Sequence, residues 1–149
     1  MIVNDIILSE SIQWACYNLG YLFQSEGSLE EIEKMYVRAL QEVEKVLGVD
    51  HTSTLDRVHN LGMLYSQQGK LEEAEKIYER ALQGMEKALG VDDISTLRAV
   101  NNLGLLYRKQ GKLEEAEKMY DRALQGMEKV LGEDDISTLK IVNNLGTLY

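Results

Sequence analysis

The chain has 149 residues, of which 44% are hydrophobic and 28% charged, and it contains no proline. Its 16 basic and 25 acidic residues give a formal net charge of −9, the wrong sign for non-specific binding to nucleic acid or to an anionic membrane. The single cysteine, Cys16, cannot form an internal disulfide, and this favours a reducing compartment. Because the start lacks a basic leader and no membrane-length apolar run follows, we expect a cytoplasmic protein.

Residues 1–12 form the first segment, which is rich in isoleucine and other apolar residues. Directly after it, Trp14, Tyr17 and Tyr21 are spaced to lie on one side of a helix. This aromatic stripe could form a pocket for an anchoring side chain of a partner. We favour the other interpretation, in which the first segment folds back over the stripe as an N-terminal cap, because repeat arrays need such caps.

An internal repeat begins after this segment. The tripeptide Asn-Leu-Gly occurs four times at intervals of 42 residues, starting at Asn18, Asn60, Asn102 and Asn144. We divide the chain into three repeats and the first helix of a truncated fourth, with the bounds 13–54, 55–96, 97–138 and 139–149. The second and third repeats are identical at 32 of 42 positions. The whole chain is therefore expected to form one array of about three and a half repeats.

Each repeat is expected to contain two helices. In the second copy, Leu55, Val58 and Leu61 recur at helical spacing, and a second apolar series follows the break at Gly69 and runs to Leu89. Paired aspartates such as those at 92 and 93 precede the next helix as caps. The glycine of each Asn-Leu-Gly is expected to let two helices pack closely, at Gly20, Gly62, Gly104 and Gly146. The fold class is therefore all-α.

One such unit cannot bury enough apolar surface to fold alone. Its large apolar side chains could contribute roughly 15–30 kcal/mol if fully buried. Ordering the unit costs on the order of 40–60 kcal/mol. Neighbouring repeats must therefore stack and share a core, which predicts a solenoid, and Cys16 then takes the small core position of Val58 in the next copy.

These motifs resemble a known repeat family. Leu-Gly-x-x-Tyr followed by Ala-x-x-x-Tyr, at Leu103–Tyr107 and Ala116–Tyr120, resembles the tetratricopeptide repeat signature. The usual 34-residue unit is stretched here by eight residues, and its terminal proline is missing. The segments Arg80–Gly90 and Arg122–Gly132 are similar to the 42-residue repeats of kinesin light chains and to the arrays of fungal NOD-like receptors. The resemblance implies a right-handed superhelix whose first helices line a concave groove that binds peptides or proteins, without catalytic residues.

The sequence shows no group of residues with the spacing of a catalytic or metal-binding site. His51 and His59 lack the spacing of a zinc site, and the paired aspartates lack the twelve-residue calcium loop. There is no glycine-rich phosphate loop and no nucleophile with a matching base. We therefore expect no enzyme activity, no cofactor and no metal.

The expected groove contains a series of asparagines. Amides both donate and accept hydrogen bonds, so they could pair with the backbone of an extended peptide. The asparagines concerned are Asn60, Asn101, Asn102, Asn143 and Asn144. The alternative is that the asparagine of every repeat bonds to a neighbouring helix and fixes the stacking. For Asn60 and Asn102 both interpretations stay open. For Asn101 and Asn143 we favour a ligand-facing role.

Four cations are expected on the groove side of the last two copies, at Arg98, Arg108, Lys109 and Lys140. They would suit an acidic peptide segment or a terminal carboxylate, although ordinary solvated surface charge is the alternative. The carboxylate clamp of chaperone-binding relatives is not reproduced. We therefore expect a protein or extended peptide as partner, with an acidic ligand as the specific hypothesis, and neither nucleic acid nor membrane.

The last helix is expected to leave apolar surface in water. Leu145, Leu148 and Tyr149 have no following helix in this sequence to cover them. Self-association through this end, for example as a homodimer, is therefore the alternative to groove binding as the main function.

Overall fold

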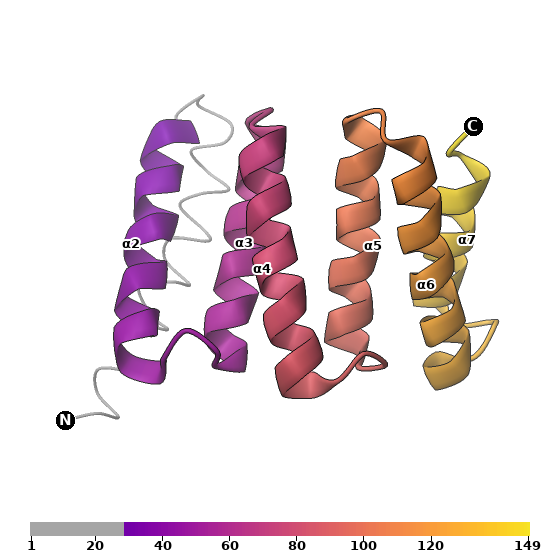
Figure 1. Ribbon diagram of the computed structural model, residues 1–149, viewed down its shortest axis with the longest axis horizontal. Helices are drawn as coiled ribbons and strands as arrows, with labels where there is room; N and C mark the ends of the chain where they lie inside the picture. Colours follow the sequence, from indigo (N-terminus) through magenta and orange to yellow (C-terminus); the bar gives the residue numbers. More distant parts are fainter. Residues whose placement is uncertain (1–28) are drawn as a thin grey trace.

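The computed structural model describes residues 29–149, and the regular structure in that range is helical. Neighbouring helices run in opposite directions, and the turns between them alternate between the two edges of the row (Figure 1). In chain order the helices are α2 (Leu29–Leu47), α3 (Thr52–Gln67), α4 (Leu71–Leu89), α5 (Ile94–Lys109), α6 (Leu113–Leu131) and α7 (Ile136–Gly146). Helices α3 with α4 and α5 with α6 are the predicted pairs, so the all-α prediction is confirmed. No described helix is long and apolar enough to cross a membrane.

The turn from a second helix to the next repeat depends on glycine. Gly90 follows α4 with φ of +96°, a conformation that side-chain-bearing L-residues rarely adopt. Its N–H donates to the carbonyl oxygen of Glu86 at 3.0 Å, which closes the last turn of the helix. The chain can therefore reverse direction within a few residues and start the next repeat.

Polar side chains then start the following helix. The carboxylate of Asp93 accepts from the backbone N–H of Ser95 at 2.8 Å, and Asp135 accepts from Ser137 at the same distance. These two contacts confirm the predicted aspartate caps. In the preceding copy the cap is instead His51, whose Nδ1 accepts from the N–H of Ser53 at 3.1 Å.

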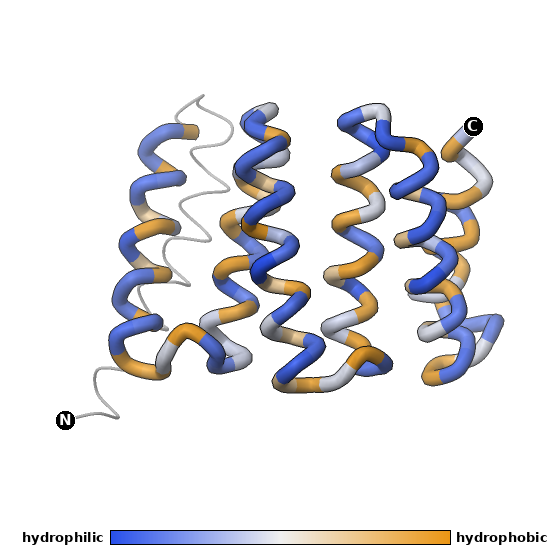
Figure 2. The backbone as a smooth tube through the Cα atoms, in the orientation of Figure 1, coloured by the Kyte–Doolittle hydropathy of each residue, from blue (hydrophilic) through white to orange (hydrophobic). Residues whose placement is uncertain are grey.

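The core lies between second helices and the first helices on either side of them. Each helix alternates apolar and polar positions, which places one apolar side toward its neighbours (Figure 2). A Cβ at Gly104 would lie 2.8 Å from the ring of the buried Tyr120, and one at Gly62 would lie 2.8 Å from the ring of Tyr78. The predicted close packing is confirmed at these two glycines. At Gly146 no atom of the described residues lies within 4 Å of the corresponding point, so the close packing is not found there, and Gly20 lies outside the described residues.

Two further expectations about burial are corrected by the structure. Leu89 was expected on the apolar side of its helix but is 39% exposed, because it lies in the last turn, beyond the neighbouring helices. Leu148, which follows the end of α7, is only 6% exposed and belongs to the core, whereas Leu139 and Val142 of α7 are 51% and 47% exposed. The exposed apolar surface at this end therefore comes from α7 itself and not from Leu148.

Candidate functional site

The expected groove residues lie along one side of the first helices α3, α5 and α7. We call this side the ladder face. Its described members are Asp56, His59, Asn60, Arg98, Asn101, Asn102, Arg108, Lys109, Lys140, Asn143 and Asn144. The aromatic stripe Trp14, Tyr17 and Tyr21 lies outside the described residues.

Side-chain hydrogen bonds join neighbouring first helices across the ladder face. The amide nitrogen of Asn102 lies 2.8 Å from Nε2 of His59, which joins α5 to α3. One repeat later, Asn144 donates from Nδ2 to Oδ1 of Asn101 at 3.1 Å, which joins α7 to α5. Asn102 and Asn144 thus bond to the neighbouring helix, as one of the two interpretations of these residues proposed. Asn143 is exposed, and Asn101 is half-buried.

The four expected cations all lie on α5 and α7, and all are exposed. Lys109 donates to Oγ of Ser66 on α3 at 3.0 Å, and Arg108 lies 3.4 Å from Oγ1 of Thr147. Arg98 and Lys140 form none of the ion pairs found in the described part of the chain. Their charges are therefore available to a ligand.

Charge separates between first and second helices. Helix α5 carries three basic residues and α7 carries one, and neither contains a carboxylate. Each of α2, α4 and α6 carries five acidic and three basic residues. The ladder face over α5 and α7 is therefore positive although the whole protein is acidic.

Comparison with known proteins decides the family. The family model for the tetratricopeptide repeat matches residues 11–87 and 92–149. The chain belongs to the tetratricopeptide repeat family. Tetratricopeptide repeats are in general protein-interaction scaffolds. No curated protein sequence matches the chain significantly.

Solved structures share the tetratricopeptide fold of this chain. BtubC (BKLC) from P. vanneervenii superposes with a TM-score of 0.80 at 24% sequence identity, over 99% of this chain and 64% of that one. A Podospora anserina protein assigned as a kinesin light chain, with nearly identical TPR-like repeats, superposes with a TM-score of 0.81 at 23% identity, over 91% of this chain and 64% of that one. This chain therefore spans less than two thirds of the length of either protein.

Of the residues that form the two bonds Asn102–His59 and Asn144–Asn101, His59 is the one that can change its protonation state. Burial lowers its pKa from 6.5 to about 4, so the ring is neutral at physiological pH. When Nε2 accepts from Asn102, the proton is on Nδ1, which is buried and has no hydrogen-bond partner among the described residues. The ring also lies beside Tyr78, with 5.0 Å between ring centroids. Protonation would bring a second donor against the amide of Asn102.

A second set of contacts between repeats, which the sequence analysis missed, lies where second helices begin. Glu75 on α4 accepts from Gln110 at 2.8 Å and from Lys112 at 2.9 Å, both in the next repeat. Glu33 accepts from Gln68 at 3.3 Å and from Lys70 at 2.8 Å in the same way. The signal was present in the sequence, because the glutamate, glutamine and lysine recur at equal intervals in the copies. We call this arrangement the junction contact.

The described residues contain no group of three or more histidine, cysteine, aspartate or glutamate side chains that could hold a metal ion. What they bring together on the ladder face is a row of amides and cations. This arrangement can donate hydrogen bonds and attract negative charge.

Proposed function

We propose that this tetratricopeptide array is a protein-binding scaffold, an adaptor or sensor segment, that holds an extended acidic peptide segment on its ladder face. The proposal includes the concave groove that the family resemblance implies and a cytoplasmic location. The observation that carries it is where the two nearly identical repeats differ.

Ten positions differ between residues 55–96 and 97–138, and six of them lie in the first helix. In the second helix the three replacements keep size or charge, as in Glu79 and Asp121. In the first helix five of the six change charge or chemistry, as in the replacement of Asp56 by Arg98, and only the replacement of Met63 by Leu105 is conservative.

One of the six positions, Arg57 in the second copy and Ala99 in the third, is buried, and the other five lie on or beside the ladder face. Packing constrains buried positions more than surface positions, so divergence on this side is compatible with contacts to a ligand. The ladder face therefore has the pattern of a surface adapted to one partner.

Positive charge supports an acidic ligand in particular. The replacements from the second to the third copy add Arg98, Arg108 and Lys109 to one helix without adding a carboxylate. A negative peptide segment would gain favourable electrostatics there, and its backbone could use amide groups of the asparagines that face solvent.

The test is affinity capture with matched charge reversals. The variant R98E/K140E changes the ladder face, and K76E/K118E makes the same change of net charge on second helices, where both lysines are exposed. We expect R98E/K140E to lose a protein that the wild-type chain and K76E/K118E both retain. The binding segment of that protein, mapped by truncation, should be acidic.

Equal retention by all three chains would contradict binding through these cations. Increasing the salt concentration provides a second readout, because exposed charge contacts weaken as ionic strength rises. Wild-type capture should therefore decrease between low and physiological salt.

Self-association, the alternative expected from the sequence, stays a prediction. Of the three residues named for it, Tyr149 is 83% exposed and Leu145 is half-buried, but Leu148 is part of the core. Light scattering at tens of micromolar distinguishes the two functions, because groove binding does not require a dimer.

A further inference from the structure

We propose a second interaction surface, separate from the ladder face, at the edge of the array where second helices end and the next first helices begin. It consists of residues 44–51, 86–93 and 128–135 and forms the lower edge in Figure 1. We call it the apolar edge. Its occupant is a basic amphipathic helix of a partner protein, in which large apolar side chains are flanked by lysine or arginine.

Exposed large apolar side chains are concentrated at this edge. Within residues 29–131, seven large hydrophobic residues are exposed, and five of them belong to the apolar edge. Figure 2 shows apolar residues in the lower turns that follow α2 and α4. Single exposed hydrophobic residues are normal on a protein surface, whereas their concentration on one edge marks an interaction site. The five residues are Val46, Val49, Leu89, Val91 and Val130.

This exposure is found inside the array and does not depend on either end of it. Leu89 and Val91 lie where α4 is followed by α5, and these two helices pack on α3 and α6. Val91 is nevertheless 54% exposed, and Val49, at the equivalent position of the preceding copy, is 53% exposed. Neighbouring repeats therefore leave these side chains open.

The fold does not require apolar residues at these positions. Glu133 takes the place of Val91 in the next copy, and the glycine before it, Gly132, has φ of +92°, close to the +96° of Gly90. Ala88 likewise stands where the other two copies have a valine. The turn is thus the same with and without the apolar side chain, so this surface is available for binding.

An ion pair joins two parts of the apolar edge. Lys129, in the last turn of α6, donates to the carboxylate of Asp92 at 2.7 Å, which brings the end of α6 against the turn that follows α4. Val130 and Val91 are the neighbours of these two residues in the chain. The apolar side chains of successive repeats therefore belong to one surface.

The charge of this surface selects a basic occupant. Its three segments contain nine acidic residues and three lysines. Arg80 and Arg122, which pair with two of the carboxylates, raise the basic residues only to five. Asp50, the equivalent of Asp92, is exposed and forms none of the ion pairs found within residues 29–149. Three helices also end here, and the negative ends of their dipoles favour cations.

A helix suits such a surface because it satisfies its own backbone hydrogen bonds and presents its apolar side chains in one stripe. Residues 1–28 of this chain do not match it, because they contain three acidic residues and neither lysine nor arginine. Two apolar edges placed together would oppose acid to acid, and an anionic membrane would be repelled for the same reason. The charge thus favours a basic helix from another protein.

The test uses a fluorescently labelled synthetic peptide of about 15 residues, long enough to form a helix, with leucines on one side and lysines on the other. It is titrated with the whole chain and followed by fluorescence anisotropy. We expect saturable binding that V49S/V91S weakens at least tenfold. The matched control is M63S/L113S, which removes two equally exposed apolar side chains elsewhere and should leave the affinity within twofold.

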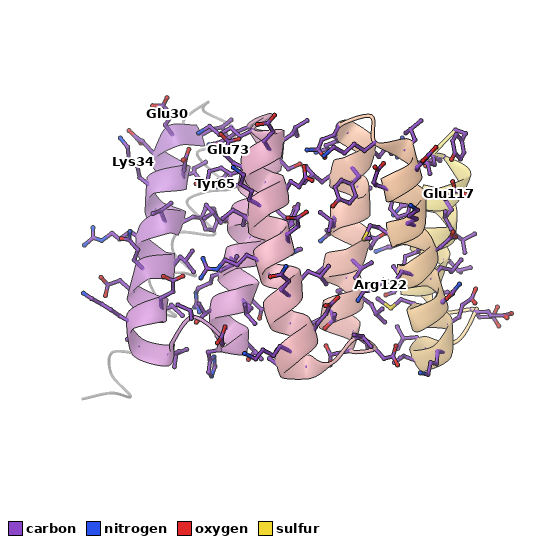
Figure 3. All side chains as sticks on the ribbon, in the orientation of Figure 1. Glu30, Lys34, Tyr65, Glu73, Glu117 and Arg122 are labelled. Carbon is purple, nitrogen blue, oxygen red and sulfur yellow. The ribbon has the colours of Figure 1, made fainter. Side chains whose placement is uncertain are left out.

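A second pair of variants tests the charge. D50N/E133Q removes two carboxylates of the apolar edge and should weaken binding several-fold. E73Q/E115Q makes the same change of net charge at the opposite edge, where Figure 3 labels Glu73, and should leave the affinity within twofold. Equal loss in both would mean that the peptide is attracted by the net charge alone, and the proposal would be wrong.

Three further results would overturn the proposal. They are absent binding, binding that V49S/V91S leaves unchanged, and equally tight binding of a peptide with glutamate in place of lysine. Binding to vesicles of anionic phospholipid that V49S/V91S abolishes would assign the apolar edge to a membrane instead. The variant R98E/K140E should bind the basic peptide as tightly as the wild-type chain, so the ladder-face function and this one can fail separately.

Discussion

Single side chains in one repeat have an equivalent in the next, so the chain contains its own controls. Gly104 and Gly146 occupy the same position but differ in surroundings, since only Gly104 contacts a buried tyrosine ring. His59 and Asn101 also share a position, and each bonds to an asparagine of the following repeat. When the same substitution has different effects on stability at two equivalent positions, the difference can be attributed to the surrounding residues rather than to the type of helix.

We predict that Gly104→Ala destabilises the chain. The new Cβ would lie 2.8 Å from the Tyr120 ring, which is fully buried. Overpacking of this kind costs about 1–3 kcal/mol, more than the helix propensity gained. Urea unfolding monitored by circular dichroism measures the change. Gly146→Ala is the matched control and should be neutral or slightly stabilising, and equal loss in both variants would refute the packing explanation.

We predict that His59 makes stability fall below neutral pH. Its folded pKa of about 4 lies below the ordinary 6.5, so the unfolded chain takes up a proton in this window while the folded chain does not. Stability is therefore retained above pH 6.5 and decreases as the pH falls toward 4, by up to about 3 kcal/mol. His59→Asn, which copies Asn101, should flatten this part of the curve.

The measurement is the free energy of unfolding of both chains in urea at several pH values from 7 to 4. Carboxylates titrate in both chains alike, so the difference between the two curves isolates His59. Parallel curves would mean that the ring is protonated equally in the folded and unfolded chains.

At the scale of the elements, the helix pairs could be predicted from the sequence, but the polar side-chain contacts between repeats could not. The period of 42 residues and the apolar spacing were enough to find α3 with α4 and α5 with α6. The cap at Asp93 followed from residue type alone. The junction contact of Glu75 was missed. The 42-residue period indicates that the copies have the same structure, but it does not indicate which polar residues of one copy contact those of the next.

The candidate site shows the same limit. The sequence placed the asparagines and cations on one side of the first helices, because helical spacing fixes which residues share a side. It could not choose between ligand and neighbouring helix for Asn102, because that depends on how far apart two first helices lie. The burial of Leu148 and the exposure of Leu139 likewise depend on how α7 is rotated on the preceding repeat.

We predict that Glu75→Ala weakens the packing of the third repeat on the second. Burial raises the pKa of Glu75, but hydrogen bonds from Lys112 and Gln110 outweigh it and hold the pKa below the ordinary 4.5. The contribution is therefore present above pH 4.5 and lost as the pH falls through the lower folded value. Exposed charge contacts are weak, so we expect a loss of up to about 1 kcal/mol at pH 7.

Chemical unfolding at pH 7 and pH 3.5 tests this, with Glu73→Ala as the control because Glu73 is exposed and accepts no hydrogen bond from another repeat within residues 29–149. The two variants should differ at pH 7, and the difference should decrease as the pH falls to 3.5. A difference that persists at low pH would point to lost packing instead of lost charge contacts.

At the scale of the whole array, the core that residues 29–149 form is largest around α4, α5 and α6 and decreases toward α7. The buried cluster contains Leu97, Val100 and Leu103 of α5 but only Ile141 and Leu148 from residues 136–149. In a solenoid each repeat contacts only its neighbours, so local stability follows the local core. The last helix is therefore held by less buried surface than the helices before it.

We predict a gradient of amide hydrogen exchange along the chain. Backbone amides of α7 should exchange fastest and those of α5 slowest among the described first helices, since opening α7 exposes less apolar surface. Mass spectrometry of exchanged peptides at neutral pH measures this. Equal protection of the two helices would show that the array opens only as one cooperative unit.

The bonds across the ladder face also have a mechanical consequence. The principal packing joins each helix to its neighbours in the chain, so successive first helices are connected to one another mainly through side chains such as Asn102 with His59. A contact of this kind resists changes in the spacing of two first helices but not the rolling of second helices over the core. We therefore expect a single replacement at position 59 or 101 to change the bending stiffness between one pair of first helices and to leave the other pair unchanged.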